Sequence, residues 1–153
     1  MDEEQFRAVY HEINAQRCVF EKAITNRRCD CQSKQRFLLA TREGIGCANA
    51  ASLQVCTDFL TMLRDKSRFA LRETFIDGVL PHNKELKVQA GGTLMLQTLL
   101  QPQVPEMQQV QNIAALLRQA LAEFSTLDQL PYGELVKGVV HYQVRPTRTP
   151  RNP

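Results

Sequence analysis

The sequence predicts an all-α protein, a compact bundle of five to six helices with a cysteine site at helix ends in its N-terminal half. Apolar residues recur at three- and four-residue intervals along most of the 153-residue chain, which is the period of one helix face. Asn, Gly and Pro interrupt these patterns where helices should begin and end. Alternating runs, which are typical of strands, are few. With 43% hydrophobic and 23% charged residues, the chain has the composition of one folded domain.

The first third of the chain is predicted to form two helices. Asp2 is placed to cap a helix over 3–25. Its apolar side chains follow helical spacing: Phe6, Val9, Tyr10, Ile13, Phe20 and Ile24. The run Asn26-Arg27-Arg28 ends this helix. A shorter helix is expected over 33–43, closed by the glycines that follow it.

The middle of the chain predicts two longer helices. Asn49 should cap a helix that runs to about residue 74, because Leu53, Cys56, Leu60 and Leu63 form one apolar stripe. Asn83 should cap the next helix, which extends through Leu100. The pair Gly91-Gly92 interrupts this pattern, and no Lys and Ser/Thr of a phosphate-binding loop follow it. The pair therefore indicates tight helix packing or a kink.

The last part of the chain predicts two further helices and a tail. One helix is expected over 110–125, and the other from Pro131 to about Arg145. We assign residues 1–144 to a single helical domain. The basic Pro/Arg tail, residues 145–153, is expected to be disordered because RPTRTPRNP has no apolar side chain to bury.

The five cysteines are the strongest functional signal. They follow the order C-x10-C-x-C-x15-C-x8-C: Cys18, Cys29, Cys31, Cys47 and Cys56. This spacing matches no ferredoxin run, zinc ribbon or zinc finger. In a reducing compartment, such cysteines indicate thiols, metal ligands or redox groups rather than a disulfide framework. We take all five as candidate cofactor-binding and metal-ligating residues, four of which suffice for one centre.

Local geometry decides which four cysteines can meet. The break at 26–28 lets the chain turn back, so Cys18 is not held a helix length away from the pair Cys29 and Cys31. Cys47 precedes the helix capped by Asn49, whose positive N-terminal end favours a thiolate. Cys56 lies on the apolar stripe of that helix, so it either packs in the core or replaces one ligand.

All-thiolate coordination selects zinc, copper(I) or an iron–sulfur cluster. Zinc usually takes close ligand pairs two to four residues apart, and here the one close pair has a single residue between its members. A four-iron cluster accepts distant cysteines and carries negative charge. Residues 17–42 hold seven basic residues against two acidic ones, which would stabilise such a cluster. The predicted cofactor is therefore an iron–sulfur cluster, with zinc as the alternative.

These observations predict a small soluble iron–sulfur protein, of the 4Fe-4S kind, for electron transfer or redox sensing. One alternative is a helical adaptor or binding module with structural zinc or packed cysteines. Another is a thiol–disulfide redox protein that uses Cys29 and Cys31, with basic neighbours to lower their pKa. No catalytic residue is assigned and an enzyme is not favoured, because the chain has no Ser/His/Asp grouping with motif support and no dinucleotide fingerprint.

Charge and hydropathy patterns bear on partners and location. The formal net charge of +3 is too small to require a nucleic-acid partner, although the basic segment and the tail leave one open. No apolar run reaches the roughly 18 to 20 residues of a spanning helix. The start, MDEEQFRAVY, carries three acidic residues where a signal peptide would be basic. We expect a cytoplasmic protein without a membrane partner, acting with an unknown redox or protein partner.

Overall fold

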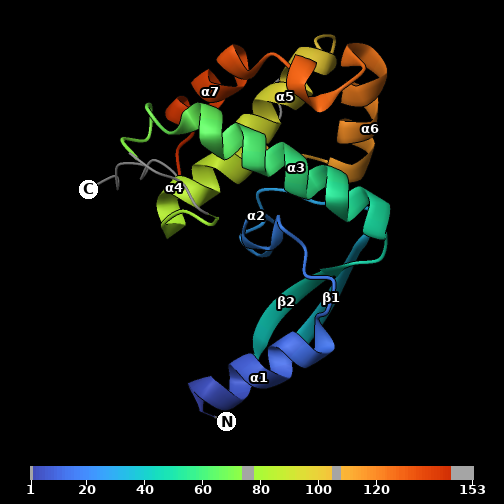
Figure 1. The fold of residues 1–153 in the computed structure, drawn as a ribbon, viewed down its shortest axis with the longest axis vertical. Coiled ribbons are helices and arrows are strands. Elements are labelled where there is room, and N and C mark those ends of the chain that lie inside the picture. The colour runs from blue at the N-terminus through green and yellow to red at the C-terminus, as the bar shows by residue number, and fades with distance from the viewer. Residues whose placement is uncertain (1, 74–77, 105–107, 146–153) are drawn as a thin grey trace, which may run out of the picture.

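Helices make up most of the protein (Figure 1), which confirms the helical fold class in its coarse form. The computed structural model describes residues 2–73, 78–104 and 108–145. The helical elements are α1 (Glu3–Ile13), α2 (Glu21–Thr25), α3 (Ala50–Ser67), α4 (His82–Leu86), the π-helix η1 (Lys87–Gly92), α5 (Thr93–Leu100), α6 (Ile113–Phe124), the 3-10 helix η2 (Leu127–Gln129) and α7 (Tyr132–His141). Within the described ranges, no helix has the length and apolar character needed to cross a membrane.

The helix expected over 3–25 is wrong as a single element. Its start is confirmed, because the Asp2 carboxylate accepts a hydrogen bond from the Gln5 backbone N–H at 2.8 Å, forming a capping box. Helix α1 nevertheless ends at Ile13. From there the backbone bonds to a neighbouring strand instead: the Cys18 N–H donates to the Ile45 carbonyl at 3.0 Å. The chain becomes helical again only over the five residues of α2.

The helix expected over 33–43 is also wrong, because this segment forms a β-hairpin. Strand β1 (Lys34–Leu39) pairs antiparallel with β2 (Arg42–Cys47). The two residues of the turn, Ala40 and Thr41, both have positive φ, at 49° and 69°. Positive φ at both positions is the condition for the turn type that matches the twist of a hairpin.

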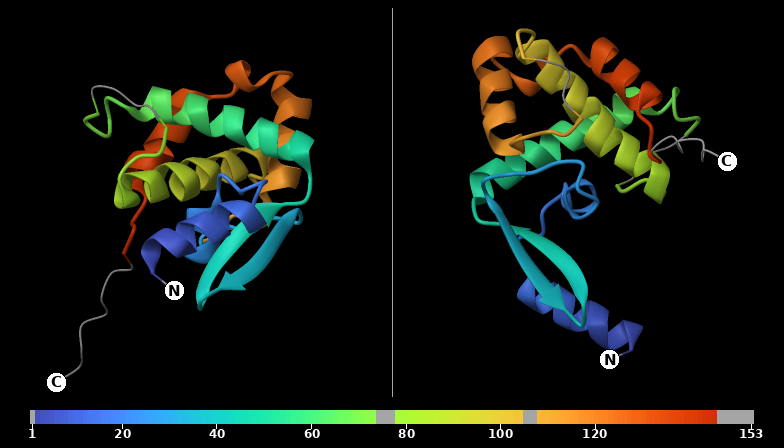
Figure 2. Two further views of the ribbon diagram at one scale, coloured as in Figure 1. Left: turned by 60° about the horizontal axis from the view of Figure 1, so that its bottom comes forward. Right: turned by 180° about the vertical axis from the view of Figure 1, so that it is seen from behind.

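The helices from α3 to α7 form one body (Figures 1 and 2). Asn49 caps α3 as predicted, through a 3.0 Å hydrogen bond from the Ser52 N–H. The helix ends at Ser67 rather than near residue 74, which lies outside the described residues. Elements α4, η1 and α5 follow one another from 82 to 100, with Pro81 rather than Asn83 at the N-cap. Helices α6 and α7 lie within the predicted ranges.

The glycine pair at 91–92 allows close helix packing, which is one of the two roles predicted for it. A Cβ placed on Gly91 would lie 2.6 Å from the Gly138 carbonyl oxygen of α7. A Cβ on Gly92 would lie 2.5 Å from a methyl group of Leu63 in α3. Because protein interiors are close-packed, larger residues here would force the helices apart. The pair therefore holds η1 against both α7 and α3.

The N-terminal part of the chain projects from this body. Helix α1 lies along the far end of the hairpin (Figures 1 and 2), and none of its residues is fully buried. Its contacts with the hairpin are aromatic and ionic: the Arg42 guanidinium lies 4.4 Å from the Phe6 ring centre, and Tyr10 contacts Phe37. The opposite end of the hairpin meets α3. The predicted tail, 145–153, lies outside the described residues except for Arg145.

Candidate metal centre

Four of the five cysteines line one small hollow at the junction of the hairpin with α3. They are Cys18, Cys31, Cys47 and Cys56. We call this space the cysteine hollow; its volume is about 20 Å³. The four thiols come from four separate segments, and all are free. The structure thus brings together four of the candidate ligands.

Backbone pairing around the hairpin places Cys18 and Cys47. The Cys18 N–H donates to the Ile45 carbonyl at 3.0 Å, and the Cys47 N–H donates to the Gln16 carbonyl at 2.8 Å. The segment before α2 therefore runs beside β2 like a third, irregular strand. This arrangement brings both thiols to the same end of the hairpin.

The start of β1 and the first two turns of α3 place the other two cysteines. Cys31 precedes β1, and its carbonyl accepts a hydrogen bond from the Lys34 N–H at 3.3 Å, which closes a turn. Lys34 lies opposite Cys47 in the hairpin register, so Cys31 and Cys47 lie at the same end. Cys56 lies about two turns into α3, on the side that faces this end.

The rest of the lining is largely apolar. Phe20, Leu53, Ile113 and Ala114 contribute side chains, together with the smaller or polar residues Ser33, Lys34, Gly46 and Ser52. Among the described residues around this space there is no His, Asp or Glu. The donor set is therefore thiol only, which is the chemistry of zinc, copper(I) and iron–sulfur sites.

Burial controls the protonation of the hollow thiols. Burial, and after it the negative charge of Cys18, Cys31 and Cys47, raises the pKa of Cys56 to about 12. Burial also raises the pKa of Cys18 to about 12, although a hydrogen bond from the Phe20 backbone opposes this effect. Without a metal both groups are neutral thiols at pH 7. Metal binding would replace their protons.

The Cys47 thiol donates a hydrogen bond to the Asn49 carbonyl at 3.2 Å. A thiolate has no proton to donate, so this bond is lost when Cys47 becomes a ligand. Cys47 is only partly buried. Of the four hollow cysteines, Cys47 is the one whose hydrogen bond would be lost if it bound a metal.

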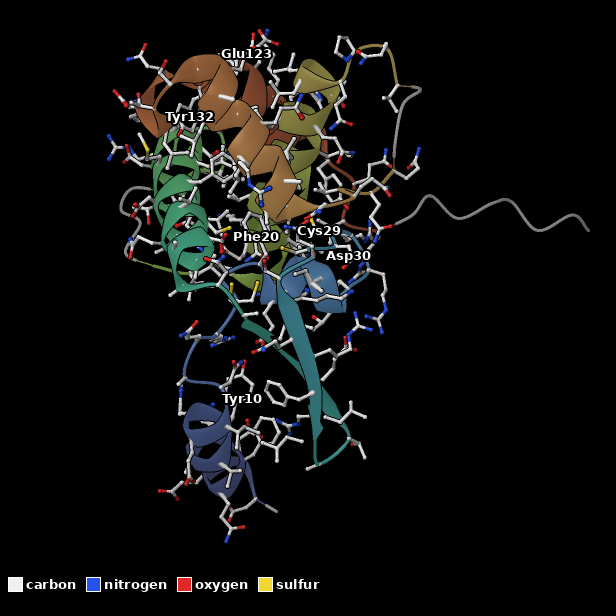
Figure 3. All side chains as sticks on the ribbon, turned by 90° about the vertical axis from the view of Figure 1, so that its right-hand side faces the viewer. Tyr10, Phe20, Cys29, Asp30, Glu123 and Tyr132 are labelled. Carbon is white, nitrogen blue, oxygen red and sulfur yellow. The ribbon has the colours of Figure 1, made fainter. Side chains whose placement is uncertain are left out.

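Cys29 does not line the hollow. Its side chain is 2% exposed, and its sulfur lies 3.9 Å from the Gln89 carbonyl of η1. Figure 3 shows it between the helical body and the hairpin, near Phe20. Cys29 pairs with Val110 in a short parallel bridge, which turns the chain so that Cys29 faces inward while Cys31 reaches the hollow. Burial raises the pKa of Cys29 well above its usual range.

The basic residues around the cysteines are mostly engaged with acidic ones. Arg27 and Arg36 both pair with Glu43, at 3.0 and 2.9 Å. Lys34 pairs with Asp30, but it is also the basic residue that lines the hollow. Because Lys34 is paired as well, the predicted positive field on the site is reduced to what remains of the Lys34 charge beside Asp30 and to the N-terminal end of α3.

A buried polar network behind the hollow was not foreseen from the sequence. The Gln89 side chain accepts a hydrogen bond from the Ala23 N–H of α2 at 3.0 Å and donates one to Glu85 at 3.1 Å. Glu85, which is fully buried, forms an ion pair with Arg64 of α3. The spacing of Glu85 and Gln89, four residues apart in a helical pattern, was the available signal. The network ties the cysteine-bearing segment, residues 14–47, to the helical body.

No group of three or more His, Cys, Asp or Glu side chains in the described ranges is arranged as a ready site for a metal ion. Comparison of the chain with protein-family models, curated protein sequences and solved structures finds no match. The geometry of the hollow is thus the basis on which a function can be argued.

Proposed function

We propose that this chain is a small iron–sulfur protein for electron transfer or redox sensing, with a four-iron cluster held by Cys18, Cys31, Cys47 and Cys56. The observation that carries the proposal is the meeting of these four cysteines, from four separate segments, around one hollow. Four thiolates are the usual ligands of such a cluster, which accepts and releases an electron when bound. Cys29, which faces η1, is not among the proposed ligands.

The size of the hollow does not by itself favour a four-iron cluster, because its eight atoms need the four cysteine-bearing segments to stand further apart than they do in this structure. The hollow has space for about one water-sized sphere, with a volume of about 20 Å³. The centre of a sphere of about 1.4 Å radius stands roughly 3 Å from a neighbouring sulfur, whereas a zinc–sulfur bond is about 2.3 Å. A four-iron cluster binds each thiolate at a different iron, so its ligands are spread more widely.

The lining supports the cluster proposal through solvation and charge. Phe20, Leu53 and Ile113 limit the access of water, and hydrophobic surroundings and solvent exposure are among the factors that tune a metal site. The Phe20 backbone N–H directed at Cys18 stabilises negative charge on that sulfur. Lys34 supplies a positive charge at the edge of the hollow.

The thiol–disulfide alternative has less support. A redox-active cysteine needs a lowered pKa and access to its partner. Cys29 is buried, and burial raises its pKa. Cys31 faces the hollow with three other cysteines, so Cys29 and Cys31 do not form an isolated pair on one surface.

Metal analysis of the full chain, purified anaerobically from iron-replete cells, tests the proposal directly. We expect about four iron atoms and about four acid-labile sulfides per chain, with a brown colour that bleaches on reduction. Zinc without iron would support the alternative of a structural zinc module. Failure to take up either metal, including after reconstitution with iron and sulfide, would mean that the cysteines simply pack.

Single Cys→Ala variants identify the ligands. Replacing Cys18, Cys31, Cys47 or Cys56 should remove most of the iron, whereas Cys29→Ala should retain it. Cys29 is the matched control because it is the same residue type, buried nearby, but outside the hollow. Thermal unfolding of each apo-protein separates ligand loss from unfolding. Iron loss on Cys29→Ala alone, with iron retained on Cys56→Ala, would contradict the assignment.

A further inference from the structure

A second cavity lies on the outer side of Cys56. It is an open groove between α3 and α6 with a volume of about 200 Å³. Its residues from α3 are Ala51, Ser52, Val55 and Cys56, and those from α6 are Ala114, Leu117, Arg118 and Leu121. Figure 3 shows the two helices next to each other in the helical body. We call this cavity the α3–α6 groove.

The walls of the groove are apolar and its rim carries one cation. Val55 and Leu121 are partly exposed, so the groove is an apolar surface that the fold does not cover. Arg118 is exposed and has no hydrogen-bond or ion-pair partner among the described residues. Other arginines behave differently: Arg17, Arg27 and Arg42, for example, are each paired with a glutamate.

We propose that the α3–α6 groove binds a small monocarboxylate with a short apolar body. The apolar body lies against Val55, Leu117 and Leu121, and the carboxylate pairs with the Arg118 guanidinium, whose forked donors suit a carboxylate. The volume of about 200 Å³ lies below the roughly 300–1,000 Å³ of pockets for drug-sized ligands, so the groove suits a small ligand. This site is separate from the proposed cluster.

The groove also shares a wall with the cysteine hollow. Ser52, Cys56 and Ala114 line both spaces. A ligand in the groove therefore contacts the same helix turn that presents Cys56 to the hollow. Binding in the groove should therefore change the surroundings of Cys56 when the cysteine site holds its metal.

Hexanoate and hexan-1-ol are suitable probes, because they share an apolar chain and differ in the carboxylate. Titration of the isotope-labelled full chain, followed by methyl NMR, should show saturable shifts of Val55, Leu117 and Leu121 with hexanoate. Hexan-1-ol should bind about tenfold more weakly. Arg118→Gln should weaken hexanoate binding about tenfold and leave hexan-1-ol binding unchanged, since only the carboxylate uses the guanidinium.

Lys66→Gln is the matched control, because Lys66 is an exposed cation on α3 outside the groove. It should leave the binding of both probes unchanged. Titrating both the metal-free and the metal-loaded protein with hexanoate separates this inference from the proposed cluster. If the chain takes up no iron but still binds hexanoate, the cluster proposal is refuted and the groove proposal stands. The groove proposal is overturned if hexanoate gives no saturable shifts, or if Arg118→Gln does not weaken its binding.

Discussion

The helical body and the cysteine-bearing segment, residues 14–47, are held together by different forces. The body contains wholly buried apolar side chains, among them Phe59, Leu60 and Leu135. The cysteine-bearing segment has fewer of these, and side-chain hydrogen bonds to its backbone fix its register. The Asn14 side chain donates to the Ile45 carbonyl at 3.1 Å, and the Glu21 carboxylate accepts from the Ile45 N–H at 2.7 Å.

This difference separates the stability of the fold from the geometry of the candidate site. Apolar burial is non-directional and stabilises the body as a whole. Hydrogen bonds fix direction and register, but each contributes only about 1 kcal/mol net. Changes in the body should therefore unfold the protein, whereas changes in the polar contacts should displace cysteines in a protein that still folds.

The largest effect is expected from Phe59→Ala, because Phe59 is fully buried in α3. Truncation leaves a cavity and should lower the free energy of unfolding by about 3–5 kcal/mol. The matched control is Phe69→Ala, since Phe69 is 83% exposed and should change stability by less than about 0.5 kcal/mol. Urea denaturation of both variants measures the difference. Equal losses would show that the body is not the source of stability.

A smaller and more specific effect is expected from Gln89→Leu. This change removes the acceptor of the Ala23 N–H and a donor to Glu85, which should lower the free energy of unfolding by about 1–3 kcal/mol. Because the network ties α2 to the body, the variant should lose most of its iron under conditions in which it remains folded.

Gln54→Leu provides the control for that experiment, because Gln54 is exposed and bonds to Asp58 on the same helix. Iron content and urea denaturation are measured on both variants. If Gln89→Leu destabilises the protein but retains full iron content, the network supports the fold without positioning the cysteines.

The smallest effects are expected from the basic residues. Arg27→Gln removes an exposed ion pair with Glu43 and should change the free energy of unfolding by less than about 1 kcal/mol. Lys34→Gln removes a positive charge from the edge of the hollow. This change disfavours the more negative, reduced form of the proposed cluster, so it should lower the cluster's midpoint potential. Redox titration at low ionic strength compares the two variants. A larger shift for Arg27→Gln would place the effective positive charge away from the hollow.

The sequence predicted helices where local signals decide the structure. The caps at Asp2 and Asn49 are contacts between residues three apart, so they can be identified without the fold. The hairpin could not be predicted in this way. Its turn, Ala40-Thr41, lacks the Asn-Gly or Asp-Gly signal. Its strands are also fixed by backbone bonds to residues 16–18, which the helical pattern assigned to another element.

All five cysteines were candidates from the sequence, but their local positions favoured Cys29 over Cys56 as a ligand, whereas Cys56 is the one that lines the hollow. Cys56 lies on an apolar stripe, as a core residue would, and yet that stripe faces the hollow. Cys29 lies in an irregular segment, as a ligand would, and yet pairing with Val110 turns it inward. That contact joins residues about 80 positions apart, so no local pattern contains it.

Helix α3 contributes to three features along its length. These are Cys56 of the hollow, one side of the α3–α6 groove, and Arg64 of the buried ion pair. Cys56 and Arg64 are eight residues apart, or about 12 Å along the axis. One residue inserted between them would turn everything beyond it by about 100° and point Arg64 away from Glu85. Between these positions the helix must therefore keep its length. The exposed hairpin turn, Ala40-Thr41, carries neither the hollow nor the buried ion pair, so a change of its length leaves both in place.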